Sequence, residues 1–146
     1  STVFLTLNTE SLGSAVTKES GEFQFESINL EEGDNELVAV AVDGGGNKSL
    51  ESVPVKIYFW DKEPKLEVTN PSDGQTVTGK DGTVEVKGQT DSGVKLTVNG
   101  RFIVLSGGGN FVTSVILTPG ENNLVIEAVD RAGNKARREL VVTHTP

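Results

Sequence analysis

Hydrophobic and polar residues alternate along most of this chain, in short runs separated by clusters of Gly, Asn, Asp and Pro. A period of two residues predicts half-buried β-strands, because successive side chains of a strand point to opposite faces of the sheet. Almost no segment shows the period of an amphipathic helix. In the second half, the alternation predicts strands at 66–69, 83–87, 94–98, 101–105, 110–116, 123–129 and 138–143. This density of short strands predicts a β-sandwich.

The predicted strands at 94–98 and 101–105 are separated only by Asn99 and Gly100. An Asn-Gly pair tolerates positive φ angles at both central positions of a type I′ turn, whose twist matches that of the flanking strands. The pair therefore predicts a β-hairpin at this point of the chain.

The first half of the chain repeats part of the pattern of the second half. The segment Gly21-Glu22-Phe23 resembles Gly109-Asn110-Phe111, and each is followed by a similar order of turn residues. From Leu30 onward the offset is constant at 87 residues, in the pairs Leu30 and Leu117, Asp43 and Asp130, and Asn47 and Asn134. A repeat of this length indicates tandem modules rather than one continuous fold.

The repeat predicts an all-β protein of two tandem immunoglobulin-like β-sandwiches, a partial module at 1–61 and a complete one at 62–146. The second module has two predicted strands within 65–88 before the strand at 94–98, whereas the first starts with the matching strand at 2–7. The first sandwich is therefore expected to lack its N-terminal strands. We expect Val3, Leu5 and Leu7 to lie on an open-edge strand, whose unpaired backbone groups could accept a strand from another copy of the chain.

The strand at 123–129 and its counterpart in the first module differ on one face. Glu127 has to face water, so positions 124, 126 and 128 are expected to face the core, and 37, 39 and 41 match them. The opposite face of the first-module strand consists of Val38, Val40 and Val42. We favour the interpretation that β-branched residues simply suit strands. The alternative is a second face covered by a partner or a neighbouring module.

Composition and charge narrow the function classes. The chain of 146 residues has 21 acidic and 13 basic side chains, a formal net charge of −8, one histidine and no cysteine. Nucleic-acid binding needs a basic surface and is not expected. The lack of cysteine excludes disulfides, thiol catalysis and the usual structural zinc sites. No run approaches the roughly 20 apolar residues of a membrane helix, so membrane insertion is not expected either.

Two loops and the boundary between the modules supply the candidate site residues. Asp43 with Asn47, and Asp130 with Asn134, could ligate calcium, but we favour a structural role in which each Asp closes its own turn. No cofactor is predicted. At the module junction, Trp60 precedes Asp61 and Glu63. We expect Trp60 to pack at the joint; the alternative is a platform that stacks on a sugar ring.

The turn motifs of the second module, taken in order, carry a family resemblance. They are Pro71-x-Asp73-Gly74, Val98-Asn99-Gly100, Gly109-x-Phe111, Pro119-Gly120-Glu121-Asn122 and Asp130-x-Ala132-Gly133-Asn134. This series resembles bacterial immunoglobulin-like repeats of the glucodextranase B-domain type. The resemblance covers nearly all of 64–146 and, less completely, 1–60. It implies a secreted or cell-surface protein in which such modules act as spacers, adhesive stalks or accessory domains.

Catalysis is not expected, since the chain has no G-x-S-x-G motif, no cysteine nucleophile and only His144, near its end, as a histidine base. We therefore predict a non-catalytic, extracellular structural, spacer or adhesive module whose partners are other modules of the same surface protein. One alternative is a polymerising filament subunit completed by strand exchange with a neighbouring copy. Another is an accessory carbohydrate-binding module of a secreted glycosidase.

Overall fold

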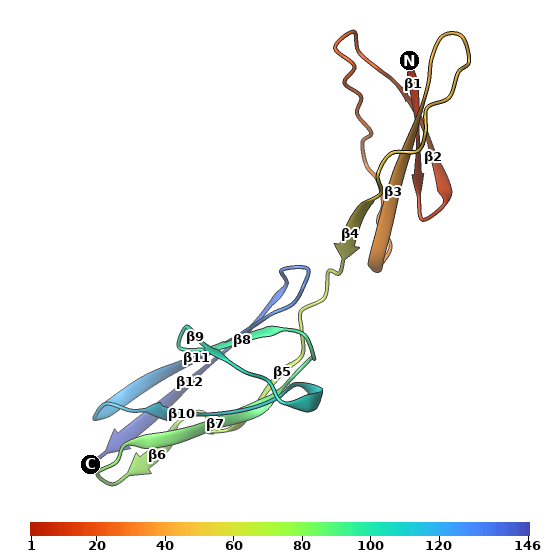
Figure 1. Cartoon of the computed structure of the whole chain (residues 1–146). Coiled ribbons are helices and arrows are strands. Elements are labelled where there is room, and N and C mark those ends of the chain that lie inside the picture. The colour runs from red at the N-terminus through yellow and green to blue at the C-terminus, as the bar shows by residue number, and fades with distance from the viewer. The chain divides into compact units, whose positions relative to one another are not determined.

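The computed structural model describes residues 1–146 and consists almost entirely of β-strands (Figure 1), which confirms the all-β prediction. The chain forms two compact units, Ser1–Asp61 (unit 1) and Lys62–Pro146 (unit 2). Its single helical element, η1 (Gly107–Gly109), is a 3-10 turn of three residues. No helix has the length and apolar character needed to cross a membrane.

Unit 2 contains two sheets. The three-stranded sheet has the order β10-β7-β5, and the five-stranded sheet has the order β6-β12-β11-β8-β9. Neighbouring strands are antiparallel except β6 and β12, which run parallel. The strand bounds are β5 (Leu66–Asn70), β6 (Gln75–Thr78), β7 (Thr83–Thr90), β8 (Lys95–Val98), β9 (Arg101–Ile103), β10 (Asn110–Ile116), β11 (Gly120–Val129) and β12 (Lys135–Thr145).

The core of unit 2 is formed by alternate side chains of both sheets. On β11, positions 124, 126 and 128 are buried, as the position of Glu127 predicts. Phe111 of β10 is 1% exposed, and Val84 and Val86 of β7 belong to the same cluster. Fully burying one Val, Leu or Phe side chain contributes about 1.5–3 kcal/mol, so the alternating pattern itself drives the two sheets together.

The predicted hairpin joins β8 to β9. Asn99 and Gly100 both have positive φ angles, 48° and 78°, as a type I′ turn requires. The Asn99 side chain accepts a hydrogen bond from the Val125 N–H at 2.8 Å, which fastens the turn to β11. The strand after the turn ends at Ile103 rather than at 105. The prediction omitted β6, which is four residues long and contains one apolar side chain, Val77.

Unit 1 contains one four-stranded antiparallel sheet of order β2-β1-β3-β4 (Figure 1). The segment 17–32, between β2 and β3, forms no strand. The order of these strands is the same as that of β9-β8-β11-β12 in unit 2, which is the physical form of the sequence repeat. The strand bounds are β1 (Thr2–Leu7), β2 (Glu10–Val16), β3 (Gly33–Val42) and β4 (Val55–Phe59).

The expectation of an open edge at Val3, Leu5 and Leu7 is wrong, because β1 is paired on both sides, with β2 and with β3. The chain turns at Asn8 and Thr9, both with positive φ, and returns as β2 to occupy the edge. In unit 2 the strands without a unit 1 counterpart lie in the facing sheet or beside β12. Unit 1 therefore has no facing sheet, whereas β1 has both neighbours.

Candidate functional site

The two Asp loops that follow β3 and β11 have the same hydrogen bonds. Asp43 Oδ1 accepts from the N–H groups of Gly45 at 2.8 Å and Asn47 at 2.9 Å, and its Oδ2 accepts from Asn47 Nδ2 at 2.8 Å. Asp130 accepts the equivalent three bonds within its own loop, each at 2.9 Å, from the Ala132 and Asn134 N–H groups and from Asn134 Nδ2. Each carboxylate thus closes its own turn.

The ionisation of these two carboxylates follows from their hydrogen bonds. The bond from the Asn47 side chain is the main cause that lowers the pKa of Asp43 below its usual 3.8. For Asp130, desolvation acts to raise the pKa, but the bonds from Asn134, Ala132 and Gly133 together lower it. No group of three or more His, Asp or Glu side chains is arranged to hold a metal ion. Calcium binding at either loop stays the alternative interpretation.

The predicted junction residues follow β4. Trp60 comes directly after the strand and is half-buried, whereas Asp61 and Glu63 are exposed. Pro64, just beyond them, is buried within unit 2. The role of Trp60 in stiffening a joint stays a prediction.

The apolar side of β1 is the buried part of unit 1. Val3, Leu5 and Leu7 are 5%, 8% and 6% exposed. Their neighbours across the β1–β3 ladder, at 41, 39 and 37, are only half-buried. The three residues proposed as an edge therefore form the centre of an incompletely covered sheet face.

The opposite face of the unit 1 sheet carries a groove of about 510 Å³. Its floor includes Val40 and Val42, two of the three valines that made this face apolar in the sequence, and the ring of Phe4, which is 44% exposed. Lys48 and Glu51 add one charge of each sign to the lining. An exposed ring beside polar groups can stack on a flat ligand and orient it through hydrogen bonds.

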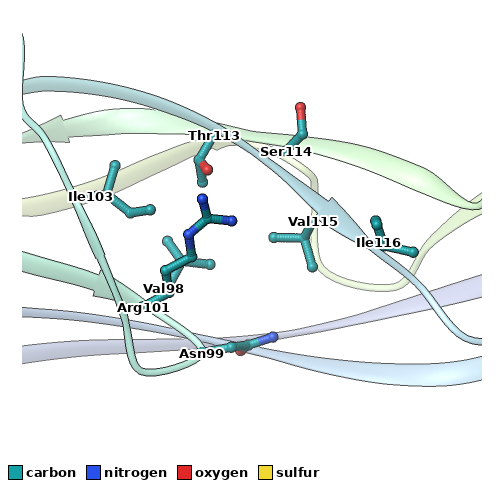
Figure 2. A pocket seen from close by; sticks show the side chains of 8 residues that line it. All are labelled: Val98, Asn99, Arg101, Ile103, Thr113, Ser114, Val115 and Ile116. Carbon is teal, nitrogen blue, oxygen red and sulfur yellow. The ribbon is translucent and has the colours of Figure 1, made fainter.

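Unit 2 has a pocket of about 330 Å³ where the ends of β8 and β9 face β10 (Figure 2). Apolar side chains line it from both sheets, including Val98, Ile103 and Val115. Figure 2 shows the Arg101 side chain extending into the space between Ile103 and Val115, in the direction of Thr113. The pocket combines apolar walls with one cation. The sequence did not predict it, because 101–103 and 113–116 lie in different sheets and meet only in the folded unit.

The single histidine, His144, packs inside unit 2, although in the sequence it stands out only as a possible base near the end of the chain. His144 is 5% exposed, and its Nε2 lies 2.8 Å from the carbonyl oxygen of Gly79. Its Nδ1 is buried without a hydrogen-bond partner. The ring lies so close to Gly82 that a Cβ there would be 2.6 Å from the His144 Cε1. The alternation of β12 could have revealed this burial, since position 144 shares a face with Val142.

A model of the family described as glucodextranase, domain B, matches residues 64–145. Over 129 residues the chain is 33% identical to bacillopeptidase F of Bacillus subtilis (strain 168), a match that covers 86% of this chain and 9% of that protein. Over 113 residues it is 29% identical to amylopullulanase of Thermoanaerobacterium thermosulfurigenes, covering 75% of this chain and 6% of that protein. The chain thus spans less than a tenth of the length of these curated relatives.

Among solved structures, the chain is similar to the fibronectin(III)-like modules of Clostridium thermocellum CbhA. The TM-score is 0.60 at 16% sequence identity, and the match covers 99% of this chain and 78% of that one. At this identity the likeness concerns the fold, and it agrees with an all-β, sandwich-like architecture.

Proposed function

The chain belongs to the glucodextranase domain B family through residues 64–145, and from this membership we propose that it is a non-catalytic structural segment of a secreted or cell-surface protein. In this role it spaces or supports the domains that carry the activity of the whole protein. Its partners are the neighbouring modules of that protein. The location outside the cell is supported by the resemblance to repeats of secreted and surface proteins.

One observation carries the proposal. The two relatives have names that denote different activities, a peptidase and a pullulanase, and the matched segment makes up 9% of one and 6% of the other. A small segment shared by proteins of different activity suits a role that both need, rather than either reaction. A structural role also agrees with the use of the ionisable side chains: Asp43 and Asp130 close turns, and His144 packs against Gly82.

The proposal can be tested on the purified chain. We expect no hydrolysis of casein or pullulan, measured as release of peptides or reducing sugar. We also expect no retardation of the chain in native gels that contain pullulan, starch or a mixed-linkage glucan. Turnover of any of these substrates that persists through repeated purification would contradict a non-catalytic role.

A carbohydrate-binding accessory role is the second candidate, and the groove on unit 1 is the observation that favours it. Phe4 offers an exposed ring, with Lys48 and Glu51 close enough to line the same groove. The half-buried Trp60 is the other aromatic candidate. If a polysaccharide retards the chain in the gel, Phe4→Ala and Trp60→Ala show which ring binds it. Retardation that either substitution abolishes would replace the spacer role with carbohydrate binding.

A further inference from the structure

The sheet of unit 1 repeats the strand order of one sheet of unit 2. The β1–β2 turn lies two residues nearer the start of β3 than the β8–β9 turn lies to the start of β11, since Asn8 bonds Glu36 and Asn99 bonds Val125. Leu5 pairs with Ala39 across β1 and β3, as Val98 pairs with Ile126 across β8 and β11. Strand β4 continues the repeat, because it pairs with the start of β3 as β12 pairs with β11. The two sheets therefore present equivalent faces, and what covers one face indicates what fits the other.

In unit 2 this face is a closed interface. The three-stranded sheet β10-β7-β5 packs on it, and the β11 side chains at 124, 126 and 128 are at most 1% exposed. In unit 1 the equivalent β3 side chains at 37, 39 and 41 are only half-buried, and Val55 of β4 is 56% exposed. The same surface that forms a sheet–sheet interface in unit 2 is thus partly uncovered in unit 1.

The edge of the unit 1 sheet shows the same difference. In unit 2, residues Val142 to Thr145 of β12 pair with the parallel strand β6. The equivalent positions in unit 1 are 57–60, at the end of β4, and β4 pairs only with β3. A strand placed beside β4 would extend the unit 1 sheet in the way that β6 extends the sheet of unit 2.

A third observation comes from the segment between β2 and β3. Residues 22–26 alternate as Glu-Phe-Gln-Phe-Glu and match the start of β10, yet they form no strand. Strand β10 pairs with β7, and unit 1 has no counterpart of β7. As a result, Phe23 is 47% exposed, whereas its counterpart Phe111 is 1% exposed.

The glycine before each of these segments fits the same explanation. Gly109 and Gly21 both have positive φ, 83° and 86°. A Cβ on Gly109 would lie 1.9 Å from the carbonyl oxygen of Thr90 in β7, so β7 approaches the backbone closely there. Nothing lies within 4 Å of the equivalent position on Gly21. Unit 1 thus has open space where unit 2 has β7.

We propose that unit 1 is the acceptor half of a β-sandwich, and that it binds a polypeptide segment of the kind seen at residues 64–93. Such a segment supplies two alternating strands that cover the inner face, one of which pairs with residues 22–27, and a short strand that extends β4. The occupant is a separate segment of this type and not a second copy of this chain. In a second copy the segment is already held in unit 2, where it contributes to a core of twelve buried apolar side chains.

The test is a fusion that places a second copy of residues 64–93 directly before Ser1 of the full chain. By ladder register, Ser1 precedes β1 as Val94 precedes β8, so this fusion copies the connection that leads into β8 in unit 2. Hydrogen exchange followed by mass spectrometry reports on residues 22–27 and 57–60. We expect exchange there to slow by about tenfold or more, which corresponds to about 1.4 kcal/mol of added local stability.

A matched control carries Val84→Asp and Val86→Asp in the added copy only, since these two side chains are buried in unit 2. The control should leave exchange at 22–27 and 57–60 as fast as in the unmodified chain. The segment 64–93 added in trans as a peptide gives a second measurement that does not require the fusion to fold. Unchanged exchange with both the fusion and the peptide would overturn the proposal.

A third outcome concerns the source of the segment. If the unmodified chain forms dimers by light scattering, and residues 22–27 become protected as its concentration rises, the occupant is a second copy and the proposal is overturned. This inference is independent of the proposed spacer role. Failure of the fusion to protect unit 1 would leave the hydrolysis and gel-retardation tests unaffected.

Discussion

The core of unit 2 contains twelve buried apolar side chains, whereas Val3, Leu5 and Leu7 are the only buried apolar side chains of unit 1. The two units share the same four-stranded sheet, so the difference arises from what lies on it. In unit 2 a second sheet covers the inner face and β6 covers the edge of β12. The comparison teaches that one sheet with the right alternation fixes strand order and register, while a closed core also needs a facing layer.

The units also differ in charge. Residues 1–61 carry three basic and eleven acidic side chains, so their net charge is 3 − 11 = −8, the charge of the whole chain. Residues 62–146 carry ten of each, and their net charge is zero. Mutual repulsion among like-charged molecules opposes non-specific association. The net negative charge therefore lies on the unit with the less completely buried apolar surface, where it opposes such association.

Truncating the matched phenylalanines gives the largest expected effect and tests the comparison directly. Phe111→Ala should destabilise unit 2 by about 3–5 kcal/mol, because it removes a fully buried ring and leaves a cavity. Phe23→Ala should cost unit 1 a small fraction of that, since the ring is 47% exposed. Urea unfolding followed by circular dichroism measures both variants. Equal losses would show that the two cores are equally closed.

Adding one methyl group at Gly88 should give the next largest effect. A Cβ there would lie 2.0 Å from the carbonyl oxygen of Glu67 and 2.8 Å from the Cζ of Phe111. Gly88→Ala should therefore push β5 and the ring apart and destabilise unit 2 by about 2–3 kcal/mol, the upper part of the range for overpacking. Gly107→Ala is the matched control, because nothing lies within 4 Å of its Cβ position. Melting temperatures that fall by the same amount in both variants would contradict the close packing of β5 on β7.

The asparagines at the third position of β3 and of β11 should contribute equally to stability, which tests the similarity of the two units rather than their difference. Asn35 bonds the backbone N–H of Glu31 and the carbonyls of Glu31 and Gly33. Asn122 bonds the equivalent backbone groups of its own loop. Asn35→Ala and Asn122→Ala should each cost about 1–2 kcal/mol, through lost bonds and unpaired backbone groups. Hydrogen exchange of both loops measures the loss of stability. A loss in only one of the two variants would show that the matching asparagines do not contribute equally to the stability of their units.

Acid should produce the smallest effect, again in both units. The pKa values of Asp43 and Asp130 lie below the ordinary 3.8 in the folded state. The unfolded state therefore takes up protons first, and the stabilisation present at neutral pH is lost as the pH falls below about 4 and through the folded-state values. Urea midpoints at about pH 7 and about pH 3 measure the loss. Asp43→Asn and Asp130→Asn should each make the urea midpoint fall less between these two pH values. If a variant loses as much stability in acid as the unmodified chain, the replaced carboxylate does not have this role.

The sequence predicted the local elements of this protein well, because they depend on neighbouring residues. The alternation located all the long strands of unit 2, Asn99-Gly100 located the hairpin, and Glu127 indicated which face of β11 is buried. The family resemblance is confirmed by the match over 64–145. Each of these depends on side-chain period or turn chemistry within a few residues.

The features that the sequence did not predict depend on contacts between distant segments. Strand β6 is too short to show a period and exists through its pairing with β12. The edge assignment of β1 was wrong, since the order of strands within a sheet is set by which hairpin returns beside it. The pocket beside Arg101 and the burial of His144 likewise need both sheets in place.

The parallel pairing of β6 with β12 has a mechanical consequence. Strand β6 lies near the start of unit 2 and β12 at its end, so stretching the chain between its termini pulls the two strands in opposite directions along their length once β5 has detached. Their ladder, from Gln75–Val142 to Thr78–Thr145, is then loaded in shear, and its bonds must break together rather than one after another. The contact between the His144 side chain and the Gly79 carbonyl oxygen also joins β12 to the residue that follows β6. The topology of unit 2 thus opposes extension with several bonds at once.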